Sequence, residues 1–366
     1  MTKSKVLIIL PGIFGGKDRT MGGSERMVVN LCNNLDRSKI DVVLCLLNAK
    51  ENYENIIKPD VKTVVLDTRV YTSLFKIIKI IKSEKPDIIM STLTHLNIYL
   101  SIFRFLISSK IKIVARESNV LSLFLSKKSF IQRIACRVFF KRFDKIIAQS
   151  KDMEEDLNKN FSVPNNKIVV INNFVDENFI ERKLSERIEE DIFPNDRINL
   201  LSIGRLFYQK GYDILLHSFS KFEYKDDYYL TILGDGPERE PLETLILKLN
   251  LEGHVCLKGY VDNPYKYMAC ADVFISSSRF EGFPNVVIES LVCGLPVVSS
   301  FYIGGINEIL SDSDFGQIIN IEDVSELQNA INNVRHKDKG VIKQKALDRY
   351  SKDRLLKKYE SVFLYN

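Results

Sequence analysis

The sequence has no closely spaced cysteines and no long apolar run. Its six cysteines are scattered without a C-x-x-C pair, so a disulfide framework is not indicated and a reducing cytoplasm is expected. No stretch reaches the roughly 18 apolar residues that a membrane-spanning helix needs. The apolar stretch at residues 6–10 is too short for a signal peptide and predicts a first strand. Internal repeats and the G-x-G-x-x-G fingerprint of a dinucleotide site are also absent.

The composition that is present indicates an ordinary globular protein with two domains. The 366 residues are 45% apolar and 27% charged, and this length exceeds what one core usually supports. The net charge of +5 is unevenly spread. Residues 74–145 contain fifteen Lys or Arg against four acids, a balance of +11, which leaves −6 for the rest of the chain. A basic segment in an otherwise acidic protein suggests an anionic partner surface.

Short apolar runs alternate with helical patterns along the whole chain. The first series of predicted strands covers residues 6–10, 42–46, 61–66, 88–90, 111–115 and 145–148. The second covers 200–203, 229–233, 254–257, 273–275, 296–299 and 316–319. This alternation predicts two Rossmann-like, doubly wound parallel sheets. The polar stretch 176–196 lacks apolar periodicity and is placed as the linker between them. Residues 345–364 predict a last helix.

Two glutamates, Glu281 and Glu289, flank the start of one predicted helix. Glu281 falls in the preceding loop and Glu289 about one turn inside the helix. Gly282 and Pro284 shape the loop, so the amides near Phe283 and Asn285 can face an anion. Phe283, Pro284 and Asn285 are therefore candidate ligand contacts. Carboxylates beside an anion site suit a ligand with phosphates and hydroxyls, such as a nucleotide sugar. The pattern also fits a helix whose acidic loop is stabilised by the dipole.

Two cations follow the first strand of the second series. Arg205 ends the run 200–203 after Gly204, and Lys210 precedes Gly211 and a helical pattern. Both are therefore expected at the carboxyl edge of a parallel sheet, where open α/β sheets bind ligands. Arg can grip a phosphate with two parallel hydrogen bonds, and Lys adds a point charge. By themselves the two residues would also fit a solvated surface.

The first half of the chain offers three further candidate sites. The loop Gly22-Gly23-Ser24-Glu25 permits close backbone approach, with Ser24 able to cap the next helix. His95 follows the strand at 88–90, although a lone His is more often structural. The pair Arg116 and Glu117 ends the strand at 111–115. It is interpreted either as an acceptor or phosphate contact or as an ion pair that caps a loop, with neither favoured.

Two other patterns are weighed against simpler interpretations. Asp312-Ser313-Asp314 matches the D-x-D motif that binds divalent ions, but it lies between apolar runs and is predicted to be a turn. No other metal-ligand spacing occurs, so metal-independent chemistry is expected. Residues 126–145 predict a helix with Arg133, Arg137 and Lys141 on one face and apolar residues on another. Such a helix can lie on an anionic membrane or pack on a core with a solvated basic face. The +11 segment favours the membrane.

Together these pieces resemble the family 4 glycosyltransferases of the GT-B fold. The matching segments, in order, are Gly22-Gly23-Ser24-Glu25, Gly204-Arg205-Leu206-Phe207-Tyr208-Gln209-Lys210-Gly211, Gly234-Asp235-Gly236-Pro237, Glu281 to Glu289, and Gly304-Gly305 before Glu308. Each is weak alone, but the ordered set spans nearly the whole chain. The resemblance implies two domains facing a cleft: an acceptor-binding domain at 1–180, a nucleotide-sugar-binding domain at 181–345, and a helix at 346–366 that crosses back onto the first domain.

The resemblance also assigns roles to individual residues. It implies that Arg205 and Lys210 meet the donor diphosphate, that Glu281 holds the sugar hydroxyls and that His95 contacts the sugar near C6. Glu289 would bind the ribose, and the backbone at 258–261 would read the base. The remaining residues implied for the donor are Gly23, Gly204, Gly236, Tyr260, Val261, Phe283, Pro284 and Asn285, while Ser24, Arg116 and Glu117 are candidates for acceptor or phosphate contacts.

The function implied is transfer of a hexose or N-acetylhexosamine from a nucleoside-diphosphate sugar, a UDP-sugar in the first instance, with retention of configuration. The nucleotide sugar is a substrate, so no cofactor and no metal are expected. The basic first domain suggests a glycan acceptor on a polyprenyl diphosphate at the inner face of the cell membrane, with a peripheral cytoplasmic enzyme and no nucleic acid. A nucleotide-sugar epimerase of the same architecture and a non-catalytic nucleotide-sugar-binding protein remain as alternatives.

Overall fold

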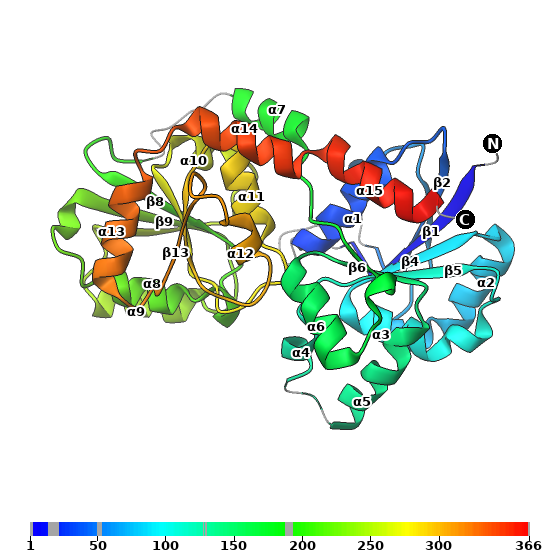
Figure 1. Ribbon diagram of the computed structural model, residues 1–366. Coiled ribbons are helices and arrows are strands. Elements are labelled where there is room, and N and C mark those ends of the chain that lie inside the picture. The colour runs from blue at the N-terminus through cyan, green and yellow to red at the C-terminus, as the bar shows by residue number, and fades with distance from the viewer. Residues whose placement is uncertain are drawn as a thin grey trace. The chain divides into compact units, whose positions relative to one another are not determined.

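The structure is a computed structural model that describes residues 3–13, 22–49, 53–126, 128, 130–186 and 193–364. The chain forms two compact units (Figure 1). The first comprises Met1–Phe174 together with Asp353–Asn366, and the second comprises Val175–Lys352. The fold of each unit is described by itself.

A seven-stranded parallel sheet forms the centre of the first unit. Its strands lie in the order β3-β2-β1-β4-β5-β6-β7. They are β1 (Ser4–Leu10), β2 (Ile40–Leu46), β3 (Lys62–Val65), β4 (Ile88–Thr92), β5 (Lys112–Arg116), β6 (Lys145–Ala148) and β7 (Ile168–Val170). The register places Val6 opposite Val42 on one side and opposite Ile88 on the other.

Helices of the first unit cover both faces of this sheet (Figure 1). They are α1 (Gly23–Asn34), α2 (Leu74–Glu84), α3 (Thr94–Ile102), α4 (Leu121–Phe124), α5 (Phe130–Phe139), α6 (Lys151–Phe161) and α15 (Lys352–Leu364). Short 3₁₀ helices connect some of them: η1 (Tyr53–Ile56), η2 (Val70–Thr72), η3 (Phe103–Leu106), η4 (Phe140–Arg142) and η5 (Asn165–Lys167).

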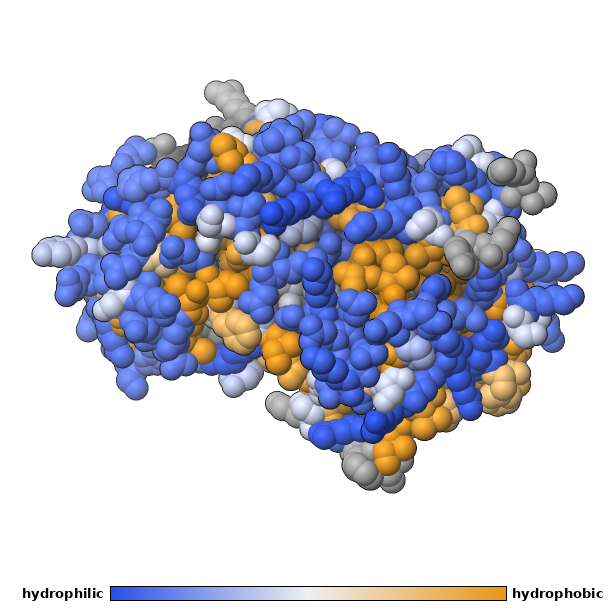
Figure 2. All heavy atoms as spheres, viewed as in Figure 1, coloured by the Kyte–Doolittle hydropathy of each residue, from blue (hydrophilic) through white to orange (hydrophobic). Residues whose placement is uncertain are grey.

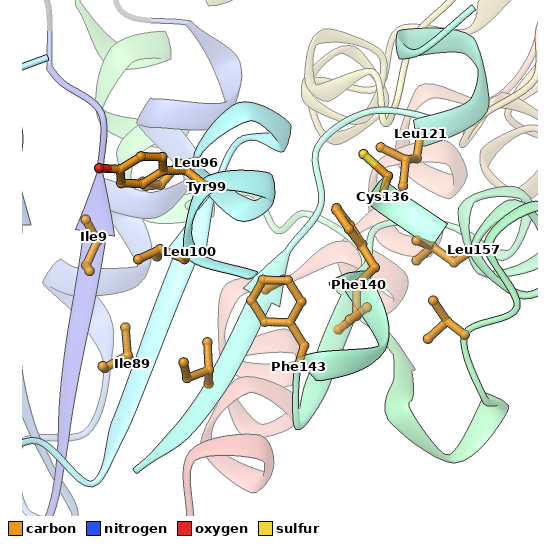
Figure 3. Close-up of a cluster of buried hydrophobic side chains, with 14 of the residues drawn as sticks. Ile9, Ile89, Leu96, Tyr99, Leu100, Leu121, Cys136, Phe140, Phe143 and Leu157 are labelled. Carbon is orange, nitrogen blue, oxygen red and sulfur yellow. The ribbon is translucent and has the colours of Figure 1, made fainter. Parts of the chain in front are cut away.

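Alternate residues of the central strands enter two separate cores. In β1, Leu7 and Ile9 pack with α3 and α5, whereas Val6, Ile8 and Leu10 pack with α1 and α15. Strand side chains point to opposite faces in turn, so a strand covered on both sides reads as a continuous apolar run. Figure 3 shows the first of these cores, where side chains of α3, α4, α5 and α6 gather beside β1 and β4.

A six-stranded parallel sheet organises the second unit. Its order is β10-β9-β8-β11-β12-β13. The strands are β8 (Ile198–Ile203), β9 (Tyr228–Leu233), β10 (Val255–Gly259), β11 (Val273–Ser276), β12 (Val297–Ser300) and β13 (Gly316–Ile319). Two hydrophobic clusters again divide the strand residues, with Leu201 and Phe274 in one and Leu200 and Ile275 in the other.

The helices of the second unit also lie on both faces of its sheet (Figure 1). They are α7 (Glu177–Ser185), α8 (Tyr212–Phe219), α9 (Arg239–Lys248), α10 (Tyr265–Cys270), α11 (Asn285–Val292), α12 (Ile306–Ile309), α13 (Val324–Val334) and α14 (Lys339–Tyr350). The 3₁₀ helices are η6 (Tyr208–Lys210) and η7 (Lys225–Asp227).

The predicted strands are all present, and the structure adds β7, which the sequence analysis missed. Two other expectations need correction. The stretch 176–196 is not only a linker, because Asp176 caps α7 and Phe179 packs on Tyr265 with ring centroids 6.0 Å apart; residues 187–192 lie outside the described residues. The predicted last helix is two helices, α14 and α15, separated at Ser351.

The end of the chain belongs to the first unit. Leu355, Leu356, Tyr359 and Phe363 of α15 are buried in the same cluster as α1 and β1, and Ser4 donates a hydrogen bond to the carbonyl of Phe363 at 3.0 Å. The change between units falls at residues 352–353 rather than 345–346, and the earlier change falls at 174–175, so residue 180 lies inside α7 of the second unit.

Candidate functional site

Each sheet reverses its strand order at one place, which is where open α/β sheets bind ligands. In the second unit the reversal lies between β8 and β11. The loop after β8 (residues 204–211, here the Lys210 loop) and the loop after β11 (residues 277–284, here the Glu281 loop) both leave the sheet at this point. In the first unit the reversal lies between β1 and β4, whose connections lead to the starts of α1 and α3.

An ion pair joins the two loops of the second unit. Lys210 Nζ lies 2.7 Å from Glu281 Oε1, with side chains only 20% and 14% exposed. Gln209 donates to Glu281 Oε2 at 3.1 Å, and Ser278 donates to Oε1 at 3.1 Å. The structure therefore brings together two predicted site residues that are distant in sequence. The carboxylate is held in one orientation by three donors, and its cation partner is also available to an anion.

Glycines allow the backbone to pass closely beneath this pair. A Cβ at Gly204 would lie 2.7 Å from Lys210 Cε, so a larger residue would displace the lysine stem. Gly234, with φ +135°, and Gly236 approach the Lys210 loop in the same way: Cβ atoms there would lie 2.0 Å from Gly204 O and 2.4 Å from Leu206 O. Gly204 and Gly236 are therefore needed because a side chain at either position would collide with neighbouring protein atoms. No ligand contact is required to explain them.

Arg205 takes a different direction from Lys210. Its side chain is exposed, and its guanidinium lies 5.0 Å from the centroid of the Phe207 ring. Among the described residues it forms no ion pair. The loop thus presents one cation that is already paired with Glu281 and one that is stacked on an exposed aromatic ring and open to an anion.

The segment from Glu281 to Glu289 has the predicted local structure. Helix α11 begins at Asn285 after Pro284, which caps it without a side-chain hydrogen bond, and Glu289 is its fifth residue. The Phe283 ring is 6% exposed and packs in the core. A Cβ at Gly305 would lie 2.4 Å from that ring. Because the ring is buried, Phe283 can contact a ligand only through its backbone.

The loop after β10 carries the residues assigned to the base. Tyr260 is 56% exposed, whereas Val261 packs partly against the core of the second unit. Gly259 has φ +86°, and its carbonyl accepts a hydrogen bond from the Gly234 amide at 2.7 Å. The loop is thereby tied to the same glycine-rich region as the Lys210 loop.

His95 lies in the first turn of α3, directly after the carboxyl end of β4. Its side chain is half-buried, and burial lowers the pKa of its imidazole, which favours the neutral form. Leu93, the cap of α3, has φ +72°. A branched residue with positive φ stores backbone strain, and such strain often accompanies functional sites.

Arg116 is fully buried at the end of β5 in a network of neutral partners. It donates to the Tyr359 hydroxyl at 3.0 Å, to Ser24 at 3.3 Å and to Thr92 at 3.4 Å, and it also contacts Asn173. Two expectations are corrected here. Gly22, not Ser24, caps α1, and the Ser24 hydroxyl accepts from Arg116. Within the described residues Arg116 forms no ion pair with Glu117.

Glu117 is also fully buried, but its partners lie in α3. Its carboxyl accepts hydrogen bonds from Thr94 and, at 3.2 Å, from Asn97, and the Ser118 amide adds a third at 3.1 Å. Burial raises the pKa of this carboxyl despite these donors. Arg116 and Glu117 therefore tie the end of β5 to different helices, Arg116 to α1 and α15 and Glu117 to α3.

The raised pKa of Glu117 predicts a pH-dependent stability. Folding disfavours the ionised carboxyl, so the free energy of unfolding falls as pH rises above about 4.3, the ordinary value, towards the raised pKa. Glu117→Gln removes this dependence. We expect the Tm of the variant, relative to wild type, to rise between about pH 5 and pH 8. Thermal unfolding at both pH values, with exposed Glu252→Gln as the control, measures it. A Tm difference that is unchanged or falls with pH would contradict the assignment.

The Asp312-Ser313-Asp314 segment forms a turn. The Phe315 amide donates to Asp312 O at 3.0 Å, and the Asp314 amide donates to Asp312 Oδ1 at 3.1 Å. Lys345 and Arg349 of α14 bind the two carboxylates, with Arg349 Nη2 2.9 Å from Asp312 Oδ2. These cations occupy the carboxylate oxygens that a metal ion would need.

Among the described residues, no three His, Cys, Asp or Glu side chains are grouped as ligands for a metal ion. No helix in the same residues is both long and apolar enough to cross a bilayer.

Several residues at the ion pair were not predicted from the sequence. Gln209 and Ser278 hold Glu281 directly, and Arg279 joins the Glu281 loop to Asp213 of α8 at 2.8 and 2.6 Å. Buried Tyr302 lies close enough for Glu281 to raise the pKa of its phenol, to which burial contributes most. Gln209, Ser278 and Arg279 lie close to Lys210 or Glu281 in the sequence, and this proximity could have identified them as site residues. Nothing in the sequence marked Tyr302.

Comparison with known proteins agrees with this architecture. Residues 185–354 match the family "Glycosyl transferases group 1", and residues 21–179 match "Glycosyltransferase Family 4". The chain is 31% identical over 331 residues to N-acetylgalactosamine-N,N'-diacetylbacillosaminyl-diphospho-undecaprenol 4-alpha-N-acetylgalactosaminyltransferase of Campylobacter jejuni, covering 87% of this chain and 88% of that protein. It is 26% identical over 316 residues to the amylovoran biosynthesis glycosyltransferase AmsD of Erwinia amylovora, covering 85% of each.

Solved structures share the fold at low identity. The Anabaena protein Alr3699/HepE, solved in complex with UDP, has a TM-score of 0.79 at 19% identity and covers 98% of this chain and 99% of its own. Sucrose-phosphate synthase from Thermosynechococcus elongatus has a TM-score of 0.80 at 17% identity, covering 99% and 98%. The two parallel-sheet units, the ordered motifs and the 31% identical relative lead to one conclusion: this chain is a glycosyltransferase of the GT-B fold and belongs to family 4.

Proposed function

We propose that this glycosyltransferase moves a hexose or N-acetylhexosamine from a UDP-sugar to a lipid-linked glycan, with retention of configuration, at the cytoplasmic face of the cell membrane. The observation that carries the proposal is the Lys210–Glu281 pair at the strand reversal of the second unit. A cation suited to a diphosphate and a carboxylate suited to sugar hydroxyls stand side by side there, as a nucleotide sugar requires.

The donor half of the reaction follows from these charges. Breaking the glycosidic bond leaves negative charge on the β-phosphate, which Arg205, Lys210 and the amides at the start of α11 would stabilise. Glu281, held by Gln209 and Ser278, would orient the sugar. We assign the ribose to Glu289, the base to the loop of Tyr260 and Val261, and a contact near sugar C6 to His95, the roles that the family resemblance implies.

We further propose that the reaction needs no metal ion. Two cations, Arg205 and Lys210, are available for the diphosphate charge, and the D-x-D carboxylates are bound by Lys345 and Arg349. Retention of configuration would follow from attack on the same face of the sugar that the diphosphate leaves, with the departing phosphate accepting the proton of the acceptor hydroxyl.

The acceptor proposal rests on charge and on one relative. The name of the Campylobacter relative describes a substrate built on diphospho-undecaprenol, and AmsD serves the synthesis of amylovoran. Residues 74–145 of this chain carry the +11 balance. A lipid diphosphate and anionic headgroups would both be attracted to such a segment, which supports a role in the synthesis of a surface polysaccharide or glycan.

Donor turnover tests the proposal. Purified protein with a lipid extract would be given UDP-, GDP- and ADP-sugars, with and without EDTA, and both nucleotide release and products would be followed. We expect UDP release that depends on lipid, persists in EDTA and yields an α-linked product from an α-linked donor. Release of an altered free sugar without an acceptor would favour an epimerase. Binding without any turnover would favour a non-catalytic protein.

An aromatic and basic surface of the first unit supports membrane association. Tyr71 and Phe105 are 77% and 71% exposed, and a row of ring contacts through Tyr99 and Phe103 connects them. Phe75 beside them is 82% exposed. Arg142 of η4, which follows α5, donates a hydrogen bond to the carbonyl of Ile102 in α3 at 3.4 Å. We give the name aromatic-basic face to the exposed apolar and basic residues of η2, η3, α5 and η4, which pack on α3, and of α2, which packs on η2. Its further members are Leu106, Ile134, Val138, Lys79, Lys82, Arg137, Lys141 and Arg142.

Helix α5 combines the two interpretations weighed from the sequence. Cys136 and the following Phe140 are buried in the core, whereas Ile134 and Val138, 47% and 53% exposed, lie among basic residues. In Figure 2 hydrophobic and strongly hydrophilic residues lie next to one another over α5, at the lower edge of the view. The helix packs on the core and also presents apolar side chains that a membrane interface would bury.

Replacing Phe75 and Phe105 by serine is expected to weaken binding to phosphatidylglycerol vesicles at least about tenfold, because each buried phenylalanine contributes ~1.5–3 kcal/mol. Vesicle flotation measures the effect. Tyr224→Ser, an 80% exposed aromatic residue of the second unit, is the matched control and should bind as wild type. Equal flotation of all three proteins, or equal binding to phosphatidylcholine vesicles, would contradict a role for this face.

A further inference from the structure

The Lys210 loop and the Glu281 loop are joined by three hydrogen bonds, each of which is accepted by a backbone carbonyl. The Arg279 amide donates to Gln209 O at 2.8 Å, Gln209 Nε2 donates to Phe280 O at 2.8 Å, and Ser277 Oγ donates to Lys210 O at 2.8 Å. These bonds set which residue of one loop stands opposite which residue of the other. The distance between Lys210 Nζ and Glu281 Oε1 depends on that register.

The Arg279 side chain closes the outer side of this junction. Its two terminal nitrogens lie 2.8 and 2.6 Å from the two carboxylate oxygens of Asp213, in the first turn of α8. Nη1 also donates to Tyr208 O at 2.7 Å, and the guanidinium lies 4.0 Å from the centroid of the Tyr208 ring. The planar guanidinium therefore contacts Asp213 at the start of α8, the Tyr208 carbonyl and the Tyr208 ring at the same time. A lysine ammonium cannot make this set of contacts.

The charges of this pair are stable at neutral pH. Burial opposes ionisation of Asp213, but the hydrogen bonds and charge of Arg279 lower the pKa of that carboxyl below its ordinary value. The Arg279 side chain is 19% exposed. Its guanidinium contacts are made to Asp213 and Tyr208, not to Lys210 or Glu281.

We propose that Arg279, anchored by Asp213, is a positioning residue that holds Lys210 and Glu281 in register for the donor. This inference rests on the proposed function of that pair. Without the Arg279 contacts the Lys210 loop keeps its sequence and its cation but loses the bonds that fix Tyr208 and the start of α8 against residues 277–281. A displacement of about 1 Å at a reacting group can lower the rate roughly 10²-fold.

The test compares Arg279→Ala, Arg279→Lys and Asp213→Asn with Arg349→Ala. Arg349 is a matched control because it also pairs with an aspartate, Asp312 at 2.9 Å, and lies 5.0 Å from an aromatic ring in the same unit. Calorimetry measures the Kd for UDP, donor turnover gives kcat and KM, and Tm reports folding. We expect the Arg279 and Asp213 variants to lose about tenfold or more in kcat/KM. Arg279→Lys should be as impaired as Arg279→Ala. Arg349→Ala should keep the kcat/KM of wild type, and the Tm values of all the variants should be similar.

A double-mutant cycle with Lys210→Ala separates positioning from general stability. If Arg279 acts through Lys210, adding Arg279→Ala to Lys210→Ala should change the UDP Kd by less than about threefold, because residues that share one function are non-additive. Full additivity, or Arg279→Ala and Asp213→Asn variants equal to Arg349→Ala, would overturn the inference. If wild-type protein bound no nucleoside diphosphate, the proposed function itself would be overturned. That outcome is distinct from additive variants of a protein that does bind UDP, which would overturn only the role of Arg279.

Discussion

Lys210→Ala and Glu281→Gln are each expected to lower kcat/KM for the sugar donor about 10²–10³-fold, the usual effect of removing one preorganised group from a site of developing charge. Lys210→Ala removes a cation from the diphosphate and leaves the Glu281 carboxylate with only Gln209 and Ser278 as donors. Glu281→Gln keeps the size of the side chain but removes the charge that holds Lys210 2.7 Å away.

The double variant is expected to be little worse than either single variant, because each change already separates the pair. Steady-state kinetics with the preferred donor measures all three proteins, and Tm values within a few degrees of wild type would exclude loss of folding. Arg239→Ala, which removes an ion pair with Glu243 at 2.8 Å on α9, is not a suitable control because Arg239 also donates a hydrogen bond to the carbonyl of Leu257 in β10. Lys343→Ala, at a surface pair with Glu181, is suitable. Variants that keep activity within about threefold would remove this pair from the mechanism.

Gly211→Ala is expected to cost as much activity as either charge change. Gly211 caps α8 with φ +65°, and a Cβ there would lie 2.1 Å from the carbonyl oxygen of Ser277. Because that oxygen belongs to the backbone of the Glu281 loop, one of the two loops must move. We expect a loss of about 10²-fold in kcat/KM together with a lower Tm.

Gly253→Ala provides the matched comparison, since a Cβ at Gly253 meets nothing within 4 Å. Kinetics and thermal unfolding of the two variants should differ sharply: Gly253→Ala should behave as wild type or be slightly more stable. If Gly211→Ala retained full activity, the close approach of the Lys210 loop to the Glu281 loop would not matter for catalysis.

The sequence predicted the layers of this fold well because buried parallel strands are short, apolar and regularly spaced. It predicted β1 and β8 through their apolar runs. It placed Arg205 and Lys210 at the carboxyl edge of a parallel sheet and Glu281 in the loop before a helix. It could do so because strand ends are marked by Gly and charge. It could not predict that those two side chains are in contact, because the strand order β10-β9-β8-β11 is set by long-range pairing. Local patterns carry no direct information on that pairing.

The errors have identifiable physical causes. Ser24 looked like a helix cap, but the buried Arg116 guanidinium competes for its hydroxyl and Gly22 takes the cap position. Arg116 and Glu117, adjacent charges at a strand end, point to opposite faces of β5 and therefore find different partners. The continuous apolar pattern at 345–364 concealed the break at Ser351, because Tyr350 and Leu355 serve the cores of different units.

The proposed donor site is tested most directly by a crystal structure of the protein with UDP or with the intact donor that turnover identifies. We expect the diphosphate at the carboxyl ends of β8 and β11, within hydrogen-bond distance of Arg205 and Lys210, and the ribose at Glu289. The Arg279–Asp213 pair should keep its 2.8 and 2.6 Å contacts. Nucleotide bound elsewhere, with the Lys210–Glu281 pair intact and distant from any phosphate, would contradict the proposed donor site.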